Sequence, residues 1–282
     1  MNKITCVVDN TVQRSSLFWG EHGLAFWIET DQGCALFDTG QSGVVLSHNL
    51  EALGLHLQDL NALALSHAHY DHTGGLGAVL SQNPGLPIYA NADFLSPRYS
   101  LRRGEYESIG LSIPPEELTQ QADLHHSVSP IEVLPGLWTT GEIQERPEPE
   151  GRSAHHFVPE GDGWRPDSYR DDMSLVMDTQ EGLVLICGCC HAGLLNTLAH
   201  VQRTFQCPIV AVLGGTHLVT ADEAFLERVV SVLREDYDLR YFYLNHCTGE
   251  CAYVTLVNAF GERVKPCPVG TILIFNSERG SR

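Results

Sequence analysis

The sequence contains no long apolar run and few basic residues. None of its apolar segments approaches the roughly 18 consecutive apolar residues that a transmembrane helix needs. Only 17 Lys and Arg stand against 35 Asp and Glu, which gives a formal net charge of −18. Because a surface this acidic repels phosphate backbones and anionic lipids, we expect neither a nucleic-acid partner nor a membrane partner. A small-molecule substrate is the partner that remains.

The N-terminus does not have the composition of a secretory signal. Residues 1–9, MNKITCVVD, hold one lysine and then a short apolar run, which is typical of a first β-strand. The nine cysteines are an odd number and are scattered along the chain, as expected for free thiols in a reducing compartment. We therefore expect a cytoplasmic protein.

Strand-like and helix-like segments alternate along the chain in two series, one in the first half and one in the second half. In the first half, residues 43–53 have helical spacing, residues 60–67 are typical of a short buried strand, and a helix is expected over 73–82. In the second half, a strand at 208–215 precedes a helix with Thr220 as its predicted N-cap. This order predicts an α/β fold of two similar halves, a four-layer αββα sandwich with the two sheets face to face.

The middle of the chain has a different composition. Residues 95–172 hold nine prolines and are predicted to form an insertion or lid on a single domain that spans residues 1–282. An arginine cluster in this stretch, Arg98, Arg102 and Arg103, is either a solvated surface or a site for an anionic substrate. Four aromatic residues of this stretch could pack against the domain or line an apolar substrate slot. They are Trp138, Phe157, Trp164 and Tyr169.

The stretch LSHAHYDHTGG at residues 65–75 places metal-ligand side chains directly after a buried strand. In extended backbone, His67 and His69 point the same way and can bind one ion together. Asp71 and His72 follow at the turn into a helix and can bind a second ion or its water. Imidazole and carboxylate groups suit zinc, manganese or iron. We predict a divalent-metal site with one or two ions, with zinc as the first candidate.

The stretches HAHYDH and FDTG, the latter at residues 37–40, resemble the HxHxDH signature and the early Asp motif of the metallo-β-lactamase superfamily. The resemblance implies the αββα fold and hydrolysis by one or two metal ions at the edge of the sheets. It also implies that Asp38 holds a ligand histidine through its ring N–H, which fixes the tautomer of that histidine.

Four further stretches resemble one subgroup, named after a dihydropterin–aminobenzene-phosphate synthase. They are VVDN near the start, ICGCCHAGLLNT at 186–197, LGGTHL at 213–218 and NHCTG at 245–249. The resemblance implies that His191 and His246 are metal ligands. His217 either contributes to the site or caps the following helix.

The chain departs from the common pattern of the superfamily in two places. The stretch that would hold a middle histidine ligand is SYRDDMSL at 168–175, which has no histidine. The candidates to fill the gap are Asp172 within it and, more remotely, His155 or His156 before it. The usual bridging aspartate is replaced by Cys189, which either bridges as a thiolate or packs in the core. One hypothesis is that His191 supplies the lost contact.

We expect an enzyme, in the first place a metal-dependent hydrolase of a small, anionic ester, phosphoester or lactone. Asp71 would orient or deprotonate a water, and His191 or His246 would steady the developing negative charge. The subgroup resemblance implies an alternative, a pterin-type transferase whose metal holds a diphosphate. A non-catalytic metal-binding module is a weaker alternative.

Overall fold

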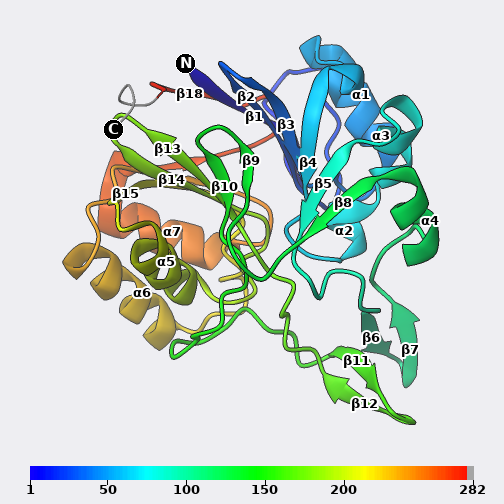
Figure 1. Cartoon of the computed structure of the whole chain (residues 1–282). Helices are drawn as coiled ribbons and strands as arrows, with labels where there is room; N and C mark the ends of the chain where they lie inside the picture. The colour runs from blue at the N-terminus through cyan, green and yellow to red at the C-terminus, as the bar shows by residue number, and fades with distance from the viewer. Residues whose placement is uncertain (278–282) are drawn as a thin grey trace.

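The computed structural model describes residues 1–277, which form two seven-stranded sheets packed face to face (Figure 1). The predicted αββα sandwich is confirmed. The first sheet has the order β18 (Ile272–Phe275), β1 (Asn2–Val8), β2 (Ala25–Thr30), β3 (Gly33–Phe37), β4 (Leu60–Ala64), β5 (Pro87–Ala90), β8 (Asp123–His126). The second has the order β17 (Val264–Pro266), β16 (Tyr241–Leu244), β15 (Ile209–Gly214), β14 (Gly182–Cys187), β13 (Leu175–Thr179), β10 (Leu137–Thr139), β9 (Glu132–Leu134).

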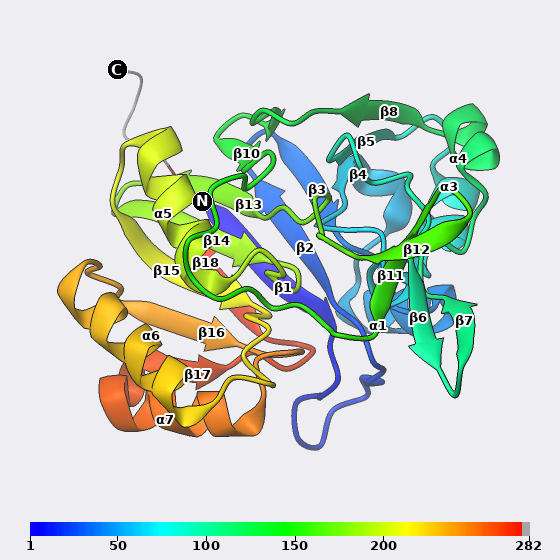
Figure 2. The same cartoon turned by 90° about the horizontal axis from the view of Figure 1, so that it is seen from below.

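Helices cover the outer face of each sheet (Figure 2). One side carries α1 (Gly43–Leu53), α2 (Tyr70–Thr73), α3 (Leu76–Gln82) and α4 (Pro115–Gln121), and the other α5 (Leu194–Phe205), α6 (Glu223–Glu235) and α7 (Glu250–Phe260). Short 3₁₀ turns lie at Leu57–Asp59 and Gly261–Arg263. No helix within residues 1–277 is both long enough and apolar enough to cross a bilayer.

Three buried apolar clusters correspond to the three interfaces between the layers. Phe26 and Phe37 from the first sheet meet Ile186 from the second in the central cluster. Trp27 packs with helical side chains on one outer face, and Phe242 does so on the other. Successive apolar residues along a strand point to opposite sides, so the continuous apolar runs of these strands supply both faces of each sheet.

The start of α6 differs from the prediction. Asp222, rather than Thr220, is the N-cap, and its side chain accepts a hydrogen bond of 2.8 Å from the backbone N–H of Phe225. Both residues are good N-caps, and the chain reaches helical geometry two residues later than the pattern of Thr220 and Glu223 indicates.

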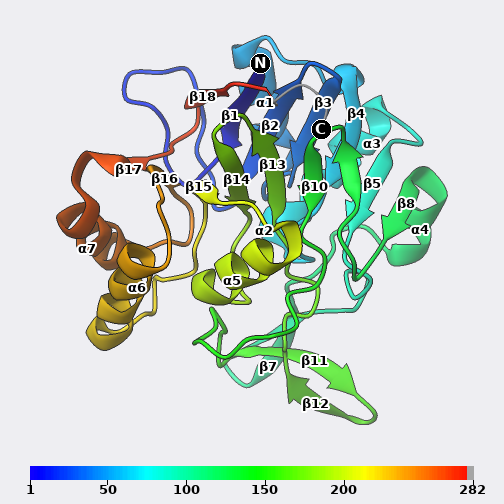
Figure 3. The ribbon, with the colours of Figure 1, turned by 60° about the vertical axis from the view of Figure 1, so that its left-hand side comes forward.

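The stretch 95–172 is not one separate insertion. Strands β8, β9 and β10 and helix α4 belong to the main layers. The remainder forms a third sheet of four strands that projects from the sandwich (Figure 3), with the order β12 (Gly163–Pro166), β11 (His156–Glu160), β6 (Tyr99–Arg102), β7 (Glu105–Ser108). Composition does not separate these parts, because prolines occur in both.

Parallel pairing brings the ends of several strands to one edge of the sandwich. β3 and β4 are parallel neighbours in the first sheet, and β14, β15 and β16 are parallel neighbours in the second. Their carboxyl ends are followed by Asp38, His67, Cys189, His217 and His246, in chain order. Ligand sites in open α/β sheets lie beyond such strand ends, so this edge is where a site is expected.

Candidate metal centre

Three sets of side-chain donors converge at this edge and share one residue, Cys189. They are the four residues Asp71, His72, Cys189 and His246, the three residues His67, Cys189 and His191, and the three residues Cys189, His217 and Cys247. Within each set, the donor atoms lie within 4.8 Å of one another. The structure thus places Cys189 at the centre of the cluster, although a packing role was the alternative on sequence grounds.

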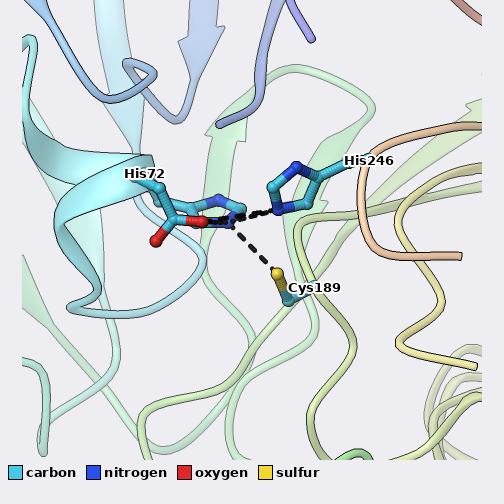
Figure 4. Close-up of side chains that lie close together, drawn as sticks. His72, Cys189 and His246 are labelled. Atoms are coloured by element: carbon cyan, nitrogen blue, oxygen red, sulfur yellow. Dashed lines mark hydrogen bonds and ion pairs between the residues drawn. The ribbon is translucent and has the colours of Figure 1, made fainter. Parts of the chain in front are cut away.

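His72 makes the closest contacts of the four-residue set (Figure 4). Its Nε2 lies 3.2 Å from the Cys189 Sγ and 3.2 Å from the His246 Nε2. The Asp71 Oδ2 is 3.5 Å from the Nε2 atoms of both histidines. Two imidazoles, a carboxylate and a thiol facing one point form a donor set that zinc commonly takes.

His67, His69 and His191 lie together on the other side of Cys189. The His67 and His69 rings are 4.6 Å apart between centroids, and His67 and His191 are 4.8 Å apart. The Nε2 atoms of His69 and His191 are buried and have no hydrogen-bond partner within residues 1–277. A buried polar atom without a partner costs about 1–3 kcal/mol, and a metal ion is a partner that would offset this cost. The residues present therefore fit a divalent ion.

Asp38 and Ser66 hold the backs of two of these histidines. The Asp38 Oδ2 is 2.6 Å from the His72 Nδ1, which is the contact expected for Asp38. The Ser66 hydroxyl donates to Asp38 and lies 2.9 Å from the His67 Nδ1. Gly188 is required here, because a Cβ at this position would collide with the Ser66 hydroxyl. Sequence reasoning missed Ser66, although it precedes His67 directly.

His246 is oriented by two residues of the stretch VVDN, for which the sequence alone indicates no role. Its backbone N–H donates to the Asp9 Oδ1 at 2.9 Å, and its Nδ1 lies 3.0 Å from the Asn10 Oδ1. The Nε2 of His246 is left to face His72 and Asp71, because the backbone N–H and the Nδ1 of this residue both have hydrogen-bond partners.

Burial and neighbouring charges give the cluster mixed protonation states. Burial, together with the surrounding imidazoles, holds the pKa values of His67 and His191 well below the usual range. Burial also lowers the pKa of His72, but Asp38 and Asp71 outweigh it and raise this pKa to about 9. His72 therefore carries a proton at neutral pH that an ion must displace, so metal binding at this set releases a proton.

The stretch SYRDDMSL, which lacks the middle histidine, holds two ligand loops in place by hydrogen bonds. The Asp171 Oδ2 accepts from the backbone N–H of Ala68, which lies between His67 and His69, at 2.8 Å. The Asp172 Oδ2 accepts from the N–H of Ala192, next to His191, also at 2.8 Å. Asp172 belongs to none of the three donor sets. Asp172 thus supports the His191 loop, and its assignment as a candidate ligand stays a prediction.

Tyr169 and His156 complete the wall behind His191. The Tyr169 ring stacks on the His191 ring with centroids 4.1 Å apart, and its hydroxyl lies 2.8 Å from the His156 Nδ1. Burial lowers the pKa of His156 to about 4. His156 lines the site cavity but belongs to no donor set among the described residues, and His155 is exposed. The replacement of the missing middle ligand by either histidine stays a prediction.

Two predictions about substrate contacts need correction. Arg98 is only 1 % exposed, and its guanidinium pairs with Asp93, Asp167 and Asp171 at 2.8–3.1 Å, so it holds the ligand-supporting segment and does not face a substrate. Two of the aromatic residues predicted for a substrate slot pack within the small sheet instead of lining the site. Trp164 stacks on Tyr106, and Phe157 packs against the same tyrosine.

The cavity at the cluster has a volume of about 140 Å³. Arg102 is the one arginine among its lining residues, and His22, which sequence reasoning missed, also lines it. The His22 Nε2 lies 3.3 Å from the Asp71 Oδ2. No local motif marks His22, because it comes from a loop between β1 and β2 that the fold places here.

Backbone strain is concentrated around the cluster. Eight non-glycine residues of the described chain have positive φ, and five of them border the site: Asp38, Tyr169, Cys190, His217 and His246. Such conformations cost of order 1 kcal/mol or more each and are retained where surrounding contacts over-determine them. Their concentration here indicates a functional centre.

Asp172→Asn is expected to make the metal-free protein relatively more stable as pH rises. Burial raises the pKa of Asp172 to about 6, while the unfolded carboxyl titrates near 4. Between these values the folded state binds a proton that the unfolded state does not, so the aspartate lowers the free energy of unfolding by roughly 3 kcal/mol as pH rises.

The measurement is urea unfolding of both proteins without metal at pH 4, 6 and 8. Across this pH range, the free energy of unfolding of the variant minus that of the wild type should rise by roughly 3 kcal/mol. A constant difference would contradict the prediction.

Both the sequence and the fold of this chain are similar to those of known proteins. A family model described as the metallo-beta-lactamase superfamily matches residues 19–162. The chain belongs to the metallo-β-lactamase superfamily. It is 27 % identical, over 290 residues, to the 7,8-dihydropterin-6-methyl-4-(beta-D-ribofuranosyl)-aminobenzene-5'-phosphate synthase of Methanocaldococcus jannaschii, with 97 % of this chain and 96 % of that protein covered. The predicted resemblance to this subgroup is confirmed.

Two further proteins are similar to this superfamily member over most of its length. It is 30 % identical, over 249 residues, to an uncharacterised protein of the same archaeon, covering 87 % of this chain and 90 % of that one. A crystal structure of a metal-dependent hydrolase of the β-lactamase superfamily superimposes with a TM-score of 0.84 and 27 % identity, covering 98 % of this chain and all of that one. The superfamily typically binds divalent metals, and this chain holds suitable ligand groups.

Proposed function

We propose that the chain is a metal-dependent hydrolase of a small, anionic ester, phosphoester or lactone. The observation that supports this most is the convergence of three donor sets on Cys189 beside a cavity of about 140 Å³. Unpartnered ring nitrogens of His69 and His191 at the same place also support it. A scaffold with no metal would leave these nitrogens unpaired in the core.

Two groups of side chains would hold the metal. Asp71, His72, Cys189 and His246 would hold one ion, and His67, Cys189 and His191, with His69 beside them, would hold another. When bound, a divalent ion supplies Lewis acidity and lowers the pKa of a water ligand to about 7. Zinc is the proposed ion, because imidazole and thiolate donors outnumber carboxylates.

Residues around the cavity would bind and orient the substrate. Burial opposes ionisation of Asp71, but His72 and His246 outweigh it and hold the pKa of Asp71 well below the usual range. Asp71 therefore stays a carboxylate that can orient a water in the cavity by accepting its hydrogen bond. Arg102 would attract the anionic group of the substrate, because its half-exposed guanidinium is at the cavity wall.

The second candidate function is transfer between two substrates, as in the relative named a synthase. Two further cavities adjoin the site. One of about 230 Å³ shares His217 with it, and one of about 590 Å³ shares His246. Hydrolysis needs room for one substrate and water, whereas condensation needs two substrate positions, so these flanking cavities favour keeping this candidate.

The test is a panel of phosphodiesters, phosphomonoesters, lactones and thioesters offered to the zinc-loaded protein. We expect hydrolysis of at least one anionic member, loss of activity on chelation and its return with zinc. Arg102→Gln should raise the KM for that substrate about tenfold with little change in kcat, because the lost contact is made equally in ground and transition states.

Arg103→Gln is the matched control, since Arg103 is adjacent but does not line the cavity. Its KM should equal that of the wild type. No hydrolysis of any member, together with condensation of an alcohol diphosphate with an arylamine, would replace the hydrolase by the transferase.

A further inference from the structure

One donor set is not used by the function proposed above. Cys189, His217 and Cys247 follow the parallel strands β14, β15 and β16, and their donor atoms lie within 4.8 Å of one another. His217 comes from the stretch LGGTHL and Cys247 from the stretch NHCTG. Of the residues in these two stretches, only His246 has a role in the function proposed above. Neither His217 nor Cys247 belongs to the other two donor sets.

His217 is held in a costly position with a nitrogen to spare. Its backbone is left-handed, with φ of 47°, and its Nδ1 is buried without a partner among the residues that the structure describes. Its ring lies 4.3 Å from the ring of His191. Gly151 makes room for it, because a Cβ on Gly151 would lie 2.6 Å from the His217 Cβ. A helix cap would require none of these features.

The surroundings of Cys247 fix its sulfur close to Cys189. The Cys247 Sγ lies 3.5 Å from the carbonyl oxygen of Cys189. On the opposite side, a Cβ at Gly215 would approach the same sulfur to 2.6 Å, so only glycine leaves the space. The Thr216 hydroxyl donates to the Thr248 hydroxyl at 3.1 Å, which ties together the two loops that carry His217 and Cys247.

We propose that Cys189, His217 and Cys247 form a sulfur-rich position of the metal centre, which takes a soft divalent ion such as zinc. The inference rests on the proposed metal centre and adds ligands to it. Two thiolates and one imidazole would together form a donor set known from catalytic zinc sites. Manganese and magnesium prefer oxygen ligands, so this position selects zinc over them.

The sulfur-to-zinc ratio of the wild-type protein tests the proposal without a mutation. X-ray absorption at the zinc edge counts sulfur ligands per ion. Cys189 alone, even as a bridge, gives at most one sulfur per zinc. Because Cys189 belongs to every donor set, an additional contact to Cys247 raises the average above one, which is the expected result. An average of one or less would overturn the inference that Cys189 and Cys247 hold an ion together.

A second experiment replaces zinc by cobalt(II), whose thiolate charge-transfer absorption grows with the number of bound sulfurs. Cys247→Ser should reduce this absorption by about a third, because Cys247 supplies one sulfur contact beside those of the bridging Cys189, and it should weaken cobalt binding about tenfold or more, as loss of a metal contact does. Cys251→Ser is the matched control, because Cys251 is exposed on α7 and belongs to no donor set. Its spectrum should match that of the wild type.

The outcomes separate this inference from the proposed function. Equal absorption in Cys247→Ser and in the wild type, with full cobalt content in both, would overturn the sulfur-rich position and leave the remaining metal centre intact. A wild type that takes up neither zinc nor cobalt would overturn both.

Discussion

His72→Ala is expected to remove one of the bound metal ions and to lower kcat/KM about 1,000-fold or more, which corresponds to about 4 kcal/mol of transition-state stabilisation. The reason is the central place of its Nε2, which lies 3.2 Å from both the Cys189 Sγ and the His246 Nε2. Without this imidazole, the four-residue set keeps only Asp71, Cys189 and His246.

Metal analysis and initial rates on the same preparations measure this effect. His125→Ala is the matched control, because the His125 side chain is 41 % exposed on β8 and stacks on Tyr89. Its metal content and rate should equal those of the wild type. Full metal content and an unchanged rate in His72→Ala would contradict the assignment of His72 as a ligand.

Asp38→Asn is expected to weaken zinc binding about 10- to 100-fold while the fold is retained. Asp38 is fully buried and accepts hydrogen bonds from the Ser66 backbone N–H and hydroxyl, each at 2.7 Å, and from the His72 Nδ1. The side-chain oxygen of an asparagine at this position can still accept the hydrogen bond from the Ser66 backbone N–H. Its amide group would then face the His72 Nδ1 and favour the tautomer with the proton on Nε2, where the ion must bind.

Asp38→Ala provides the comparison. It leaves several buried donors unpaired, so the free energy of unfolding should fall by about 3–5 kcal/mol in addition to the loss of zinc affinity. Competition with a chromophoric chelator gives the zinc affinity, and urea unfolding of the metal-free proteins gives the stability. Zinc binding by Asp38→Asn as tight as in the wild type would show that the tautomer of His72 does not depend on this contact.

The sequence predicts those parts of the molecule that depend on neighbouring residues. Short continuous apolar runs indicate the strands, and helical spacing predicts α1 with the bounds that the structure shows. His67, His69, Asp71 and His72 are recognisable because they lie within six positions after one buried strand. Asp38 follows from the resemblance, and the structure places it against His72.

The parts that the sequence does not predict depend on distant segments. His22 reaches the cavity, and Asp171 the backbone of Ala68, only through the pairing of strands far apart in the chain. Arg98 is a similar case. A basic cluster in sequence indicates a solvated or anion-binding surface, but two distant aspartates, Asp167 and Asp171, join the nearby Asp93 around Arg98, which is buried. Local patterns carry no information about such contacts.

Cys189 shows how a substitution within a motif can be interpreted in two ways. A buried cysteine is more often a packing residue than a ligand. Only the folded chain shows that its sulfur faces His72 at 3.2 Å and lies in every donor set of residues 1–277. The cysteine thus stands where it can join the two groups of ligands.

The most direct test of the account is the metal content of freshly purified, unchelated protein, measured by mass spectrometry against protein concentration. The account predicts zinc, at about two ions per chain for the two groups of ligands proposed, and an additional ion only if the sulfur-rich position is filled separately. Correctly folded protein with no bound metal, and no uptake of zinc on addition, would contradict it.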